Sequence, residues 1–193
     1  GVMLPHRLYR KRYMSAFNDI HGRLQEAERR LLANLQRIAV TGANDLSSLI
    51  SLRVVNNKQT VSGGNFTPYS KTPVPAWFYR GKSRTSSADT AVSALAKKGE
   101  KLSYSGFREL NNLDGSNKNF EFTGEMWRAV GVVGSTVSGP VAAAYIGANT
   151  KAGQDKLKWT STQEGRSVIE ASGEELDAVG QVIGELIENT LKG

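Results

Sequence analysis

Apolar side chains recur at intervals of three and four along the first forty residues of the chain. This spacing gathers them on one helical face and predicts a long amphipathic helix from Leu4 to Ile38. Pro5 suits a first helical turn, and Gly22 costs about 1 kcal/mol relative to alanine. Thr41-Gly42 is typical of a helix end, so Ala43 to Val55 is predicted to form a second, shorter helix. A long helix with one apolar stripe must lie against a core or against neighbouring subunits.

The pattern changes abruptly between Asn56 and Thr90, where Gly, Pro, Ser, Thr and Lys predominate. This composition predicts an extended loop or arm, and a loop of such length is usually functional or disordered. Five aromatic residues are too apolar for a simple linker: Phe66, Tyr69, Trp77, Phe78 and Tyr79. We expect them to dock the arm on a partner, where large rings supply contact area. The alternative is that they fold back on their own subunit.

A short helix is predicted at Ala88 to Lys98, followed by an irregular segment from Gly99 to Lys118. Strand patterns then return at three places: Phe120 to Phe122, Ala129 to Val133 and Val141 to Ile146. Gly134 to Pro140 is rich in turn formers and is predicted to be the hairpin loop. Trp127 is expected to be buried beside Met126 at the end of the first strand.

The last forty residues predict two helices. Thr150 to Thr162 has the composition of a short basic helix. Ser172-Gly173-Glu174-Glu175 is a capping-box pattern, and it opens a helix whose apolar face runs to Leu191. The predicted fold is therefore α+β, with a long N-terminal helix, a small antiparallel sheet, a C-terminal helix and a long extended loop or arm. Residues 1–193 fit one structural domain, in which 56–90 form the arm.

The composition narrows the possible partners. The chain has 193 residues, a formal net charge of +7 and a pI near 9.7, which favour polyanionic partners such as DNA. Its lack of cysteine excludes disulfides and thiolate metal sites. No apolar run approaches the about 18–20 residues that span a bilayer. We therefore expect a soluble protein, made in a cytoplasm, with no membrane partner.

No constellation for catalysis stands out. Gly81-Lys82-Ser83 ends like a phosphate-binding loop, but the position of its first glycine holds Ala76, and bulky aromatic residues fill the space between. His6 and His21 lie fifteen residues apart without companion ligands, which makes a zinc site improbable. The sequence predicts a protein that is not an enzyme, with no catalytic residues, no cofactor and no metal.

Charge is distributed unevenly along the chain. A basic cluster stands near the start, Arg7, Arg10, Lys11 and Arg12, whereas acidic residues predominate from Glu164 onward. One interpretation is that the basic cluster contacts DNA or an acidic partner ring. The alternative is that both regions are solvated helix faces that partly neutralise one another within or between subunits.

Five short segments stand in a characteristic order between Val61 and Leu191. They are VSGGNFTPYS at Val61, SYSGFREL at Ser103, NFEFTGEMWRAVGV at Asn119, AAAYIG at Ala142, and DKLKWTSTQEGRSVIEASGEEL at Asp155. The ordered set resembles the neck, or head-to-tail connector, proteins of tailed bacteriophages. The segment Pro73 to Thr90 departs from the family pattern, where a shorter lysine-rich segment would stand.

The resemblance implies a structural subunit of the virion neck. Such a subunit belongs to a homo-oligomeric ring between the portal or connector and the tail, and packaged double-stranded DNA passes through the ring with non-specific contact. Two alternatives remain: a tail-completion or tail-terminator subunit of the same particle, and a basic DNA-binding protein. The DNA-binding protein would need a recognition helix or aromatic platform that the sequence does not display.

Overall fold

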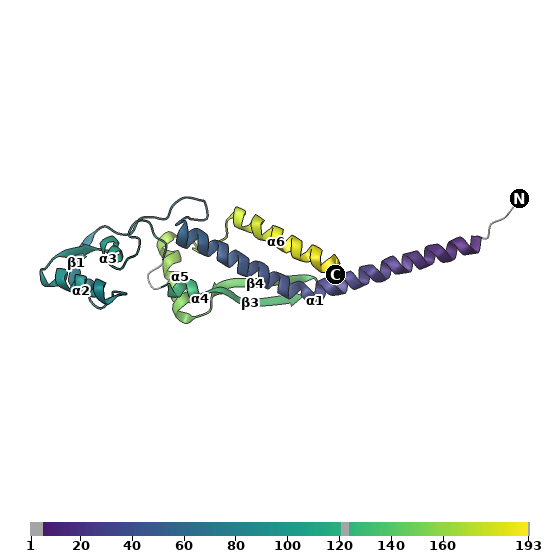
Figure 1. The fold of residues 1–193 in the computed structure, drawn as a ribbon, viewed down its shortest axis with the longest axis horizontal. Helices are drawn as coiled ribbons and strands as arrows, with labels where there is room; N and C mark the ends of the chain where they lie inside the picture. Colours follow the sequence, from purple (N-terminus) through teal and green to yellow (C-terminus); the bar gives the residue numbers. More distant parts are fainter. Residues whose placement is uncertain (1–5, 121–123, 193) are drawn as a thin grey trace.

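Helix α1, His6–Ser51, is the spine of the computed structural model (Figure 1). The structure describes residues 6–120 and 124–192, with side chains from Met14 onward except Ser15. At about 1.5 Å per residue, α1 is roughly 69 Å long, and its N-terminal part extends beyond the rest of the molecule. We call residues 6–32 the α1 extension.

The predicted helix end at Thr41-Gly42 is wrong, because α1 continues to Ser51 and then into one π-helical turn, η1 (Leu52–Asn56). Gly42 serves packing instead. A Cβ atom at this position would lie 2.7 Å from Ile183 Cδ1 and 3.4 Å from Val179 Cγ1. The glycine therefore lets helix α6 (Gly173–Lys192) approach the spine closely.

The spine packs against α6 and, elsewhere on its surface, against a β-hairpin (Figure 1). The hairpin pairs β3 (Val130–Ser138) with β4 (Val141–Ala148) in antiparallel register. Its turn is only Gly139-Pro140, with Gly139 at φ +57°, so most of the predicted loop 134–140 is strand. A lone two-stranded hairpin is marginally stable in water, and α1 supplies the surface that supports it.

The predicted strand at Phe120 to Phe122 is not seen at Phe120, whose φ of +54° is left-handed; residues 121–123 lie outside the described residues. Met126 and Trp127 lie in a short helix, α4 (Glu125–Ala129), rather than at a strand end. Met126 is buried, whereas Trp127 is half-buried against the main core. That core contains Ile50, Val54, Phe66 and Val168, with Trp127 and Leu157 at its edge.

A second core lies at the end of the molecule opposite the α1 extension (Figure 1). We call residues 68–118 the distal lobe. It contains β1 (Pro73–Pro75), the 3-10 helix η2 (Ala76–Tyr79), α2 (Ser86–Lys97), β2 (Lys101–Ser103) and α3 (Tyr104–Leu110). β1 pairs antiparallel with β2, and Tyr79, Val92 and Phe107 form the buried centre.

The lobe corrects two predictions. Within the predicted arm, residues 57–72 and 80–85 lack a helix or a named strand, whereas 73–79 form β1 and η2 and 86–90 begin α2. The ring of Tyr79 is buried against Val92 of α2 and Phe107 of α3. The predicted irregular segment from Gly99 to Lys118 likewise contains β2 and α3. The short helix predicted at Ala88 to Lys98 is confirmed as α2, which Thr85 caps by accepting a hydrogen bond from the Ala88 N–H.

The two predicted C-terminal helices are confirmed as α5 (Lys151–Glu164) and α6. The capping box is complete: the Ser172 N–H donates to Glu175 Oε2 at 2.8 Å, and the Glu175 N–H donates to Ser172 Oγ at 3.2 Å. The fold is α+β, with a long N-terminal helix, two small antiparallel sheets and a C-terminal helix.

A buried ion pair joins the end of the spine to the start of α6. Arg53 Nε donates to Glu175 Oε1 at 2.8 Å, and both side chains are at most 10% exposed. The guanidinium also donates to the backbone oxygens of Gln59 and Glu170, at 3.0 and 2.6 Å. Arg53 thus ties three chain segments to one point.

By length and composition, the helical span Ala16–Asn56 is the one among the described residues that contains a stretch apolar enough to cross a membrane, with a mean hydropathy of 1.2 over eighteen residues. Ile38 and Ile50 of α1 and Val54 of η1 are buried inside the protein. About 33% of that apolar stretch is buried in the subunit.

We expect Glu175→Gln to lower the free energy of unfolding by about 3–5 kcal/mol, since it leaves the Arg53 charge buried without its carboxylate. Urea denaturation would measure the loss. Glu188→Gln is the matched control, because Glu188 pairs with Lys192 on the exposed face of the same helix. That change should cost at most about 0.5 kcal/mol. Equal losses in the two variants would contradict the role given to Arg53.

Trp127→Ala should destabilise the protein, though by less than the about 3–5 kcal/mol of a fully buried tryptophan. The ring contributes to the main core, and its Nε1 donates to the Asn119 carbonyl at 3.3 Å. Trp77→Ala is the comparison, because Trp77 is 62% exposed; it should change stability by no more than about 0.5 kcal/mol. Thermal unfolding of the two variants side by side tests this difference.

Candidate assembly surfaces

The α1 extension presents apolar side chains to solvent. Met14, Phe17, Ile20 and Leu24 follow one another at helical spacing, and each is more than half exposed, with Phe17 at 67% and Leu24 at 64%. Phe17 stacks on His21 of the next turn, at 6.5 Å between ring centres. An amphipathic helix normally buries such a stripe against a partner.

The basic cluster predicted to contact DNA or a partner lies at the start of this extension. The backbone of Arg7, Arg10, Lys11 and Arg12 belongs to α1, but their side chains lie outside the described residues. Their role as a DNA or partner contact therefore stays a prediction.

The five aromatic residues of the predicted docking arm divide into two groups. Phe66, Tyr69 and Tyr79 are buried within their own subunit. Tyr79 stacks on Phe107 with ring centres 4.4 Å apart. Trp77 and Phe78 are 62% and 50% exposed on η2, and the Lys82 Nζ lies 3.7 Å from the centre of the Phe78 ring. Of the five rings, those of Trp77 and Phe78 are the ones largely exposed to solvent.

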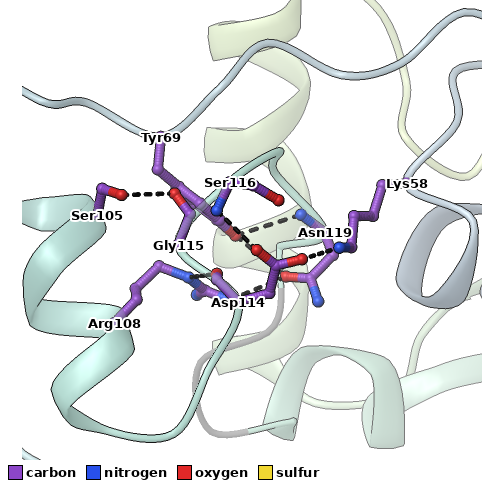
Figure 2. Close-up of polar contacts among 8 residues, drawn as sticks. All are labelled: Lys58, Tyr69, Ser105, Arg108, Asp114, Gly115, Ser116 and Asn119. Atoms are coloured by element: carbon purple, nitrogen blue, oxygen red, sulfur yellow. Dashed lines mark hydrogen bonds and ion pairs between the residues drawn. The ribbon is translucent and has the colours of Figure 1, made fainter.

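A buried polar network holds the distal lobe to the chain segment that leads back to the body (Figure 2). Arg108 of α3 donates from Nε to the Asp114 carbonyl at 2.8 Å and from Nη2 to Asn119 Oδ1 at 3.1 Å. Its guanidinium also lies 4.1 Å from the centre of the Tyr69 ring. The Tyr69 hydroxyl donates to the same Asn119 oxygen at 3.1 Å and accepts from the Asn119 N–H.

The loop at Asp114 completes this network. Figure 2 shows the Asp114 carboxylate between Lys58, which forms an ion pair with it, and the Ser116 N–H, which donates to it at 2.7 Å. A Cβ on Gly115 would lie 2.7 Å from the Ser105 carbonyl oxygen, so the close approach requires glycine. The polar network thus fixes the lobe relative to the end of the spine, where Lys58 lies.

An apolar cleft of about 490 Å³ opens between the distal lobe and helices α4 and α5. Tyr69 and Tyr104 line it from the lobe, and Met126 and Trp159 from the helices. Two lysines at the cleft are already paired, Lys156 with Glu125 and Lys118 with Glu164, the latter at 2.9 Å. The hydrogen bond and charge of Lys156 lower the pKa of Glu125, so this carboxyl stays ionised.

The apolar lining of the cleft suits contact with an apolar surface. His21 does not line the cleft, and the described residues contain no group of three potential metal ligands. The Gly81 N–H donates to the Asp89 carboxylate at 3.1 Å, an arrangement that opposes phosphate binding at Gly81-Lys82-Ser83.

Sequence reasoning missed the cleft, the Arg108 network and the Arg53 pair. Arg108 stood within SYSGFREL, a segment of the family resemblance. Its sequence context gave no sign of a buried role. A basic residue within an apolar run, as in Leu52-Arg53-Val54-Val55, was the available signal for Arg53. Comparison of the chain with protein-family models, curated proteins and solved structures finds no match.

Alkaline pH should destabilise the protein through its buried tyrosines. Burial raises the pKa of Tyr69, with the Arg108 charge opposing the shift, and burial also raises the pKa of Tyr79. In the unfolded chain both hydroxyls ionise near pH 10. Stability from these groups is therefore complete below pH 10 and is lost as pH rises through the higher folded values.

Unfolding experiments from pH 8 to 11 would measure this loss. Tyr79→Phe keeps the ring that stacks on Phe107 and removes the titrating hydroxyl, so its stability should fall less steeply above pH 10. An unchanged slope in that variant would contradict the assignment for Tyr79.

Proposed function

We propose that the protein is a structural subunit of the neck of a tailed-phage virion, where copies form a ring between head and tail. The ordered segments of the sequence motivate this assignment. The observation that carries it structurally is the α1 extension, a helix that leaves the body with its apolar stripe exposed. Isolated helices of this kind are marginal in water and gain their stability from packing.

The exposed area of the chain supports assembly. The molecule has an accessible surface of 12756 Å², whereas a compact monomer of 20.9 kDa exposes roughly 9,000 Å². A ring subunit has two neighbours, and a standard interface covers about 800 Å² on each partner. The excess area exceeds what two such contacts require.

The two ends of the molecule offer different surfaces. The α1 extension lies at one end, and Trp77 and Phe78 of the distal lobe lie at the other. Subunits joined in a neck need contacts with like neighbours and with the portal or tail above and below. The net charge of +7 suits a channel through which DNA passes.

Electron microscopy tests the assignment directly. Negative-stain images of the purified protein should show rings with a central channel, and an antibody raised against it should label the head–tail junction of virions that contain it. Label at the tail side alone would favour the tail-completion or tail-terminator alternative. A discrete dimer that binds DNA and labels no virion would overturn the proposal in favour of a basic DNA-binding protein.

A further inference from the structure

We propose that the apolar stripe of the α1 extension docks on helix α6 of a second copy of this chain. The inference rests on the proposed function and deepens it, because it names the contact that links neighbouring subunits in the ring. It follows from continuity of an existing interface, from exposed area and from charge.

The stripe continues a face that is already used within the chain. Ile38 is buried and Gly42 lies against Ile183 and Val179, so this part of α1 packs on its own α6. Towards the N-terminus α6 ends, and a groove of about 790 Å³ opens where Leu191 meets the spine near Leu24 and Ala27. Beyond the groove the same stripe continues through Phe17 and Met14, which are exposed.

Helix α6 leaves apolar side chains uncovered that can receive another helix. Leu176 and Val182 are exposed on it, Leu176 at 52% and Val182 at 36%. Gly180 and Gly184 stand one helical turn apart, and a Cβ on either would meet no atom within 4 Å. Both glycines are poor helix formers and leave room for close approach of another helix.

Charge selects α6 over a second α1 extension as the partner. The sequence of the extension has seven basic residues, Arg7, Arg10, Lys11, Arg12, Arg23, Arg29 and Arg30, against Asp19, Glu26 and Glu28. Helix α6 has four exposed acidic residues, Glu174, Asp177, Glu185 and Glu188, against Lys192 alone; its fifth, Glu175, is buried against Arg53. Pairing two extensions would bring like charges together, whereas pairing an extension with α6 joins opposite charges.

The contact also has the symmetry that a ring requires. An extension bound to α6 joins two different surfaces, so each copy keeps a free extension on one side and a free α6 on the other. Such heterologous contacts propagate from copy to copy and form a ring where the rotation between copies closes, or an open filament where it does not. A contact between two extensions would use one surface twice and stop at a dimer.

The first test compares two faces of the same helical turns. Phe17→Ser with Leu24→Ser removes the stripe, and Asp19→Ser with Glu26→Ser alters the polar face as the matched control. Light scattering after gel filtration should show loss of the ring in the first variant and an intact ring in the second. All four positions are exposed, so the melting temperature of the body should stay unchanged in both.

The second test reverses charges. One variant carries Arg23→Glu with Arg29→Glu, and a second carries Glu185→Lys with Glu188→Lys. Each should raise the protein concentration required for assembly at least tenfold. Mixing the two variants should restore it, because each extension then meets an α6 of opposite charge. Assembly that responds to the stripe but not to reversal on α6 would show pairing between extensions and overturn the inference.

The two proposals fail separately. Rings that persist in the stripe variant would overturn this contact and leave the neck assignment standing. A wild-type chain that stays monomeric at all concentrations would likewise overturn the contact, while labelling of the head–tail junction would still support a subunit that assembles only on its partner ring.

Discussion

The architecture depends on the buried pair of Arg53 and Glu175. Glu175 is the third residue of α6 and closes its capping box, so one carboxylate both begins the helix and neutralises Arg53. Arg53 in turn holds the carbonyls of Gln59 and Glu170, on the segments that leave α1 and enter α6. Because a buried charge is tolerated only when it is paired and hydrogen-bonded, these segments have one compatible arrangement. The antiparallel packing of α6 on the spine follows from it.

Patterns within single elements were sufficient to predict most of the fold. The α+β class, the long first helix, α2, the two C-terminal helices and the capping box at Ser172 were all visible in spacing and cap residues. Gly42 shows where local reasoning ends. Gly after Thr is a common helix stop, but here the packing of Ile183 determines the conformation, and packing between residues 141 positions apart leaves no local signal. The hairpin loop was overestimated for a related reason, since small polar residues also form an exposed strand end.

The candidate surfaces were predicted less completely than the fold. Composition identified residues 56–90 as unusual and their aromatic residues as important, but it could not divide those residues between core and surface. Tyr79 is buried because Phe107 lies against it, and Phe107 comes from the segment that the sequence described as irregular. Trp77 and Phe78, its neighbours in the same 3-10 turn, face outward. The side of a short turn that faces the core is decided by its tertiary partner, not by its own residues.

The chain has two small cores and a helix that extends beyond both of them. We therefore expect the isolated monomer to have a low free energy of unfolding. Folding must recover the conformational entropy of about 190 residues, and the α1 extension contributes ordered backbone without burying its apolar stripe in the monomer. The entropy cost of ordering such a helix is offset only where a neighbouring surface covers its apolar stripe. The same reasoning applies to Gly180 and Gly184, the two exposed glycines of α6. Each lowers the stability of the helix in the monomer, and this loss is offset only if another surface packs closely against them. In the assembly that we propose, contacts with neighbouring copies would complete the packing that the chain begins.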